Sequence, residues 1–159
     1  MKVKLLARYG VTAALYSLLT LALAPISYGL VQCRVSEAMC VLPWFSSAAV
    51  PGLFAGCLLA NLIAGAPLYD VVFGSLATLL AALLTRWMRR CGLSRYLAPL
   101  PSVVLNAVIV GALLYYVYEL PVGLPLAMLS VGAGQAVACY GLGIPLLLAL
   151  ERFGGKLFL

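Results

Sequence analysis

The sequence predicts an all-α integral membrane bundle of about six transmembrane helices with both termini in the cytoplasm, for three reasons. Hydrophobic residues make up 65% of the 159 positions and charged residues only 9%, whereas soluble domains carry about 25% charged residues. The apolar segments are separated by proline and glycine, and several reach the roughly 20 residues that a spanning helix needs. Basic residues gather near helix ends, which is typical of cytoplasmic loops.

Six helical segments are expected, each bounded by turn residues. They cover residues 5–24, 36–47, 51–64, 68–90, 102–118 and 126–152. Pro25 is expected to end the first, and Pro51 to separate the second from the third, because proline breaks a helix interior. Residues 65–67 and 119–125 form turns. No internal repeat or linker is visible, so residues 1–159 are expected to form a single transmembrane domain.

The basic residues predict the orientation of the bundle. With six spans, both termini and residues 86–95 fall on one side, which then holds every basic residue except Arg34. The other basic residues are Lys2, Lys4, Arg8, Arg86, Arg89, Arg90, Arg95, Arg152 and Lys156. The net charge of +6 therefore indicates orientation in the membrane and not a nucleic-acid partner.

Residues for catalysis or metal binding are scarce. The chain has no histidine, and its five cysteines form no CxxC pair, so we expect neither a metal site nor a resident cofactor. Nucleophile and phosphate-loop motifs are absent from the sequence, which argues against an enzyme. The four acids are Glu37, Asp70, Glu119 and Glu151. All lie near predicted helix ends, so a proton relay is not evident, and uphill transport would need energy from another subunit.

Small residues recur at a spacing of four, as in Ala13 and Ser17, in residues 52–64 and in residues 74–82. Such ribbons let helix backbones approach closely in lipid. Two uses remain open, namely packing inside the chain and docking of a partner.

Polar residues gather at the predicted outer side. In an extended segment, Gln32, Arg34 and Ser36 would share one face. Ser36 would then cap the next helix, with Glu37 in its first turn. Arg34 and Glu37 form either a structural ion pair or part of a ligand pocket. Further along the chain, the amides of Asn106 and Gln135 either bond between helices or contact a ligand.

A series of segments, in order along nearly the whole chain, resembles the QueT family. They are PISYG at 25–29, VQCRVSEA at 31–38, VPGLFAG at 50–56, DVVFGSLATLLA at 70–81, LNAVIVG at 105–111 and VGAG at 131–134.

The resemblance implies a substrate-binding S component of an energy-coupling factor (ECF) transporter in a prokaryotic cell membrane. Such proteins look like high-affinity capture subunits for queuosine precursors, which are 7-deazaguanine bases. The resemblance also implies six helices, substrate capture near the outer face, a transmembrane coupling protein and two cytoplasmic ATPases. A small-residue surface on the first helix would meet the coupling protein, and Ala13 and Ser17 match it.

The same resemblance suggests roles for the polar residues. Glu37 and Asp70 would be the acidic contacts. Hydrogen bonds, charge and stacking on a flat base would come from Gln32, Arg34, Asn106, Gln135, Tyr28, Trp44 and Phe73. One departure stands out, because Gln135 occupies a position where the family is expected to carry glutamate. Gln135 can donate and accept but has no charge, which leaves Glu37 as the main acidic candidate.

Three alternatives remain. An S component for another vitamin-like ligand is favoured by Gln135. A structural membrane protein without a small ligand is favoured by the small-residue ribbons. A membrane enzyme has the least support.

Overall fold

The computed structural model describes residues 2–27, 33–119 and 121–153, and its regular elements are all helices there. Four helices are long and apolar enough to cross a membrane, and two shorter apolar helices lie between the first and second of them. The four are Val3–Ala22, Asp70–Arg90, Arg95–Tyr116 and Leu124–Phe153, and the shorter two are Val35–Phe45 and Ala49–Ile63. They follow the six predicted segments in order.

Several of these helices are made of consecutive elements. In chain order, the individual elements are α1 (Lys2–Ala22), α2 (Ala24–Ser27), η1 (Val35–Val41), α3 (Leu42–Phe45), α4 (Ala49–Ile63), η2 (Asp70–Gly74), α5 (Ser75–Arg90), η3 (Arg95–Leu97), α6 (Leu100–Tyr116), α7 (Leu124–Ala136), η4 (Val137–Leu142) and α8 (Gly143–Phe153). Two of them, η2 and η4, are π-helical turns within longer helices.

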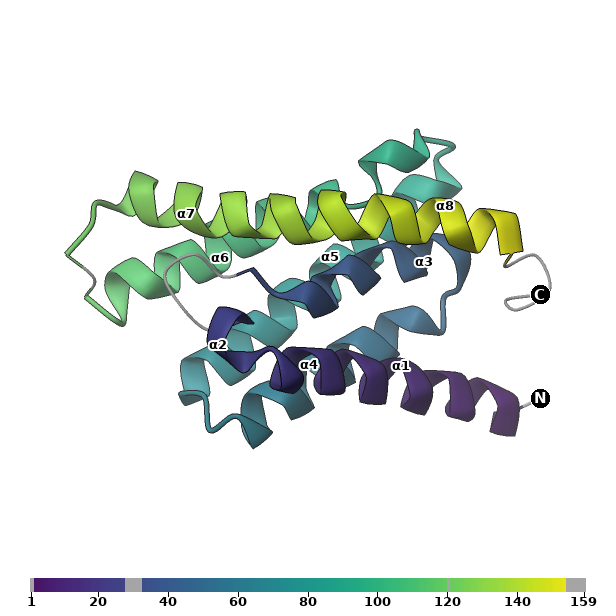
Figure 1. Cartoon of the computed structure of the whole chain (residues 1–159), viewed down its shortest axis with the longest axis horizontal. Coiled ribbons are helices and arrows are strands. Elements are labelled where there is room, and N and C mark those ends of the chain that lie inside the picture. Colours follow the sequence, from purple (N-terminus) through teal and green to yellow (C-terminus); the bar gives the residue numbers. More distant parts are fainter. Residues whose placement is uncertain (1, 28–32, 120, 154–159) are drawn as a thin grey trace.

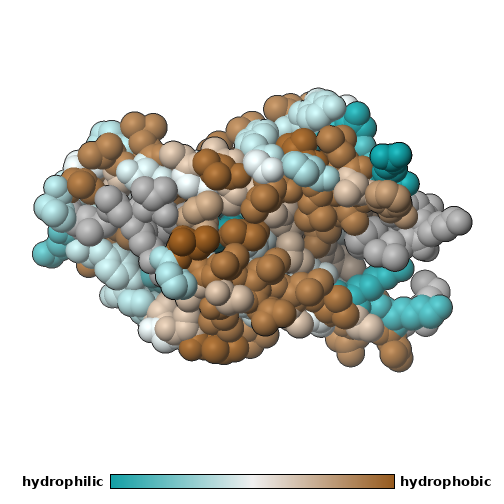
Figure 2. Space-filling model, in the orientation of Figure 1, coloured by the Kyte–Doolittle hydropathy of each residue, from teal (hydrophilic) through white to brown (hydrophobic). Residues whose placement is uncertain are grey.

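The two ends of the bundle differ in charge. The start of α1, the end of α8 and the α5–α6 turn lie at one end, whereas the α4–η2 and α6–α7 turns lie at the other (Figure 1). We call the first the basic end, because it carries Arg86, Arg89, Arg90 and Arg95. Figure 2 shows apolar side chains over the middle of the molecule and hydrophilic ones towards both ends, as a membrane-embedded bundle requires.

Close packing between α1 and α4 depends on two glycines of α4. A Cβ on Gly56 would lie 2.8 Å from the Cβ of Tyr16 and 2.9 Å from the carbonyl oxygen of Ala13, and a Cβ on Gly52 would lie 2.7 Å from that of Thr12. Neither position has room for a side chain, so the backbones approach as the small-residue ribbon predicts.

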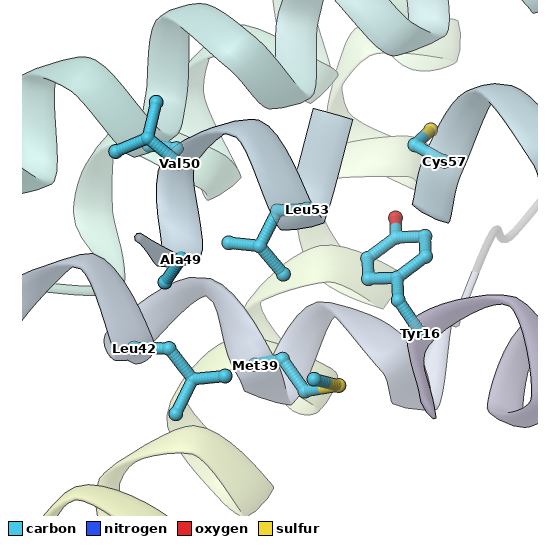
Figure 3. Packing of buried hydrophobic residues seen from close by; sticks show 8 residues of the cluster. Tyr16, Met39, Leu42, Ala49, Val50, Leu53 and Cys57 are labelled. Carbon is cyan, nitrogen blue, oxygen red and sulfur yellow. The ribbon is translucent and has the colours of Figure 1, made fainter. Parts of the chain in front are cut away.

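Tyr16, at the contact between α1 and α4, has apolar neighbours around its ring and a polar neighbour at its hydroxyl group. Tyr16 packs with Met39, Leu42, Leu53 and Cys57 in one buried cluster. Figure 3 shows the Tyr16 ring at the edge of this cluster, with its hydroxyl group directed towards Cys57. The phenol can therefore reach polar groups while its ring remains among apolar side chains.

Three local predictions were wrong. Pro25 does not end the first helix, because α1 already ends at Ala22 and Pro25 lies in the first turn of α2, where proline is tolerated. Pro51 does not start the third helix, since α4 begins at Ala49. Ser36 does not cap a helix, because η1 begins at Val35 with Arg34 at its N-cap and without a side-chain cap.

Candidate functional site

Glu37 lies inside the bundle as a buried carboxyl group with two hydroxyl donors. Its side chain is 1% exposed. The phenol of Tyr16 on α1 donates to Oε1, and the hydroxyl of Ser102 on α6 donates to Oε2 at 3.2 Å. Taking a carboxylate out of water costs several kcal/mol, so such donors are needed to keep the charge there. Three helices thus meet at this side chain.

Two buried side-chain amides, of Asn106 and Gln135, lie one helical turn from residues that contact Glu37. Asn106 donates to the carbonyl oxygen of Ser102 at 2.9 Å. The thiol of Cys139 lies 3.6 Å from both the carbonyl oxygen of Glu37 and Oε1 of Gln135. Asn106 and Gln135 are each 1% exposed. Predicted residues from three separate segments are therefore brought together by contacts through Ser102 and Cys139.

Arg34 extends this cluster towards Ser27 and Cys57. It is 2% exposed, and its Nε donates to the carbonyl oxygen of Ser27 at 3.3 Å. One terminal nitrogen lies 3.9 Å from Sγ of Cys57. Arg34 and Tyr16 therefore both lie close to Cys57, since Tyr16 and Cys57 belong to the same buried apolar cluster.

We define the buried polar cluster by these contacts. It consists of Tyr16, Arg34, Glu37, Cys57, Ser102, Asn106, Gln135 and Cys139. Among the described residues, Arg34 and Glu37 are the buried charged ones. No member of the cluster lines the surface groove between α4 and α5, the groove between η2 and α6, or the groove along α1.

The 3-10 geometry of η1 determines which side of this helix carries the Glu37 side chain. The element starts with a bond from the Glu37 amide to the Arg34 carbonyl, 2.9 Å long, and its residues from Ser36 to Val41 are all buried. With three residues per turn, Glu37 and Cys40 share one side of η1, while the hydroxyl of Ser36 meets that of Thr20 on α1 at 2.7 Å. A short apolar helix thereby carries its polar groups inward.

The π-helical turns lie beside polar contacts. The carbonyl oxygen of Asp70 in η2 accepts a bond from Nδ2 of Asn61 at 3.2 Å, and Cys139 belongs to η4. Such turns occur often at functional sites, because they interrupt the regular hydrogen-bond ladder. Here both bring a polar atom into contact with a neighbouring helix.

Three predicted site residues lie away from the cluster. Asp70 is half-buried, and its carboxylate accepts a bond from the phenol of Tyr118 at 2.6 Å. Phe73 is 44% exposed and lines a surface groove between η2 and α6. Trp44 is buried near the basic end, with the guanidinium of Arg89 stacked over its ring at 5.5 Å. Trp44 and Phe73 therefore lie outside the buried polar cluster, where Trp44 contacts Arg89 and Phe73 borders the groove.

Tyr28 and Gln32 lie outside the residues that the structure describes. Both were predicted from the segment between α2 and η1, and their roles stay predictions.

The expected docking residues Ala13 and Ser17 are covered by α4. They are 7% and 8% exposed, and the hydroxyl of Ser17 donates to the carbonyl oxygen of Gly56 at 2.9 Å. Of the two uses that the sequence left open, the structure supports packing inside the chain. The other face of α1, with Val11, Leu15 and Leu18, is exposed.

The sequence prediction missed Tyr16, Ser102 and Cys139. Tyr16 directly precedes Ser17 in the apolar first segment, and Ser102 directly follows a proline at the start of the fifth. A hydroxyl or thiol inside a long apolar helix is itself a signal, because such groups seek hydrogen-bond partners in lipid. That signal identifies candidate residues but does not say which helices they join.

Chemically, the cluster offers hydrogen-bond donors and acceptors in a buried environment. A carboxylate has about four acceptor sites, and the two hydroxyl groups account for two of them. The amides supply both donors and acceptors. No group of three or more potential metal ligands was found among the described residues.

The fold and the cluster together define a multi-pass helical membrane protein with buried charged groups in its interior. Buried charged groups within membrane helices are typical of proteins that move or bind polar solutes.

A comparison with protein families shows the family of this membrane protein. The chain matches the QueT transporter family over residues 6–152 and therefore belongs to that family. No curated protein and no solved structure matches it.

Proposed function

We propose that the chain is the substrate-capture subunit of an ECF-type importer and that it binds a queuosine precursor, a 7-deazaguanine base. The observation that carries the proposal is Glu37, a buried carboxyl group that accepts hydrogen bonds from Tyr16 and Ser102. The buried amides of Asn106 and Gln135 lie one helical turn from Ser102 and Cys139, which contact Glu37. Family membership supports transport, and the cluster supports the kind of solute.

The pairing chemistry favours a guanine-like edge. Such an edge presents a ring N–H and an exocyclic amine side by side, and a carboxylate can accept both hydrogen bonds at once. The adjacent carbonyl group of the base needs a donor, which Asn106 or Gln135 supplies. A neutral Gln135 suits this task because its amide also donates.

The proposed assembly has six membrane passes within a single domain, and both termini are cytoplasmic. Energy comes from two ATPases joined through a transmembrane coupling protein. The absence of nucleotide-binding motifs from the sequence supports this division of labour. The exposed face of α1 is the candidate contact, since Ala13 and Ser17 are used internally.

Binding to purified protein in detergent tests the proposal. We expect saturable calorimetric binding of a 7-deazaguanine base at micromolar concentration. Glu37→Gln should weaken it about 10- to 100-fold, because a hydrogen bond to a charged group contributes about 1.5–3 kcal/mol. Glu119→Gln removes a carboxylate from the α6–α7 turn and serves as the matched control.

Two results would overturn the proposal. One is a lack of saturable binding by a folded wild-type protein. The other is mass-spectrometric recovery of a different vitamin-like compound from the purified protein, which would keep the importer class and replace the ligand.

A further inference from the structure

An apolar groove at the basic end of the bundle ends in two arginines. It has a volume of about 530 Å³ and lies between the start of α4 and the outer face of α5. Its lining residues are Ser47, Val50, Pro51, Leu80, Leu83, Leu84, Arg86, Trp87 and Arg90. None of them belongs to the buried polar cluster, and none is acidic.

The length of the groove matches one leaflet of a bilayer. From Leu80 to Arg90 the helix rises roughly 15 Å, at 1.5 Å per residue, and the hydrocarbon core of one leaflet is also roughly 15 Å thick. Leu80 and Leu84 form the apolar part and are 46% and 41% exposed. Trp87, 57% exposed, lies towards the charged end, as aromatic residues do at membrane interfaces.

Among the described residues, no carboxylate forms an ion pair with the two arginines at the mouth of the groove. Arg86 makes two long contacts, at 3.5 and 3.4 Å, with the carbonyl oxygens of Pro43 and Trp44. Its Nε is buried without an acceptor in the part of the chain that the structure describes. Arg90 is exposed. The ion pair found among the described residues, Arg95–Glu151, lies on other elements.

We infer that this groove binds an anionic phospholipid, with an acyl chain along α5 and the phosphate group at Arg86 and Arg90. Guanidinium groups bind phosphate oxygens through paired N–H donors. Basic pockets between membrane helices are suited to anionic lipid headgroups. The combination of a leaflet-length apolar floor, an interfacial tryptophan and two arginines favours a lipid over a soluble anion.

Native mass spectrometry of the full chain in detergent tests the inference. We would add phosphatidylglycerol or phosphatidylcholine with identical acyl chains and measure the affinity for each. We expect phosphatidylglycerol to bind more tightly. Arg90→Gln should weaken its binding about fivefold and Arg86→Gln/Arg90→Gln about 25-fold, because each basic residue near an anionic surface contributes about a factor of five.

A matched control removes two charges elsewhere. Lys4→Gln/Arg152→Gln lowers the net charge equally, and neither residue lines the groove, so this variant should retain the lipid preference. Leu84→Trp should weaken binding of phosphatidylglycerol while leaving all the arginines in place. Should the double arginine variant fail to fold, Arg90→Gln and Leu84→Trp provide the same comparison.

Three outcomes would overturn the inference. Equal affinity for both lipids would make the groove a general acyl-chain site. Equal loss in the control and groove variants would make the effect one of net charge. Competition by glycerol 3-phosphate as strong as that by the lipid would identify a soluble-anion site.

Discussion

Tyr16 donates a hydrogen bond to Glu37 across the contact between α1 and η1, and it does so from a helix that the sequence marks only as apolar. The phenol is 1% exposed and so is the carboxylate. This pair links the packing of the first helix to the candidate site, because Tyr16 also lies against Gly56 of α4.

Removing the phenol hydroxyl should destabilise the protein. We expect Tyr16→Phe to lower the free energy of unfolding by about 1.5–3 kcal/mol, because a buried carboxylate loses a charge-assisted donor. Tyr9→Phe removes a hydroxyl from the same helix and should change the free energy of unfolding by less than about 0.5 kcal/mol. Equilibrium unfolding in mixed micelles measures both. In a Glu37→Gln background the cost of Tyr16→Phe should shrink, and an undiminished cost would contradict the pairing.

The close approach of α1 and α4 predicts opposite effects for two glycines. Gly56→Ala should destabilise the protein by about 1–3 kcal/mol, because its Cβ would meet Tyr16 and Ala13 below contact distance. Gly10→Ala adds a methyl group to open space on α1 and should stabilise the helix by up to about 1 kcal/mol. Thermal unfolding in detergent compares them. Equal effects of the two substitutions would show that α1 and α4 do not pack in this way.

The contact between Tyr118 and Asp70 predicts a pH effect at high pH. Burial, followed by the hydrogen bond to Asp70, raises the pKa of the Tyr118 phenol above its ordinary value. The contact should therefore contribute its full stability below about pH 10, the ordinary tyrosine pKa, and lose it as the pH rises through the raised pKa. The ultraviolet titration difference between wild type and Tyr118→Phe isolates this phenol. A single ionisation at or below the ordinary value would contradict the contact.

Thiol labelling tests which end of the bundle faces the cytoplasm. Cys91 is exposed at the basic end, whereas Cys40, Cys57 and Cys139 are buried. A membrane-impermeant maleimide should label Cys91 in inverted vesicles and leave it unlabelled in whole cells, since basic loops stay cytoplasmic. Cys91→Ser should abolish that signal. Labelling of Cys91 in whole cells would reverse the proposed orientation.

The positions of the helices could be predicted because each apolar segment is long and ends at a proline, a glycine or a charge. The separation of residues 36–47 from 51–64 also followed from proline chemistry, although the break falls at residues 46–48 instead of at Pro51. Pro25 misled the prediction because its position in a first turn and its position after a last turn look alike in sequence.

The sequence did not predict in the same way which side of each helix faces the protein core. In a bilayer both the lipid side and the core side of a helix are apolar, so hydrophobic periodicity does not identify the inward face. Glu37, Asn106 and Gln135 could be selected as candidates because polar groups in apolar segments are conspicuous, and their roles remain predictions. Trp44 was predicted only to stack on a ligand, because its position near the basic end depends on η1 and α3 forming a short buried helix.

The π-helical turn η4 lies between α7 and α8 and sets how far one is rotated about the helix axis relative to the other. An α-helix turns about 100° per residue, and a π-helical turn accommodates one residue more than an α-helical turn does. Deleting one residue within Val137–Leu142 would therefore restore a regular helix and rotate Gln135 relative to Leu147 by roughly 100°. The turn therefore sets the rotation of one half of this helix relative to the other, so that Cys139 contacts the carbonyl oxygen of Glu37 while Leu147 is buried in the apolar core.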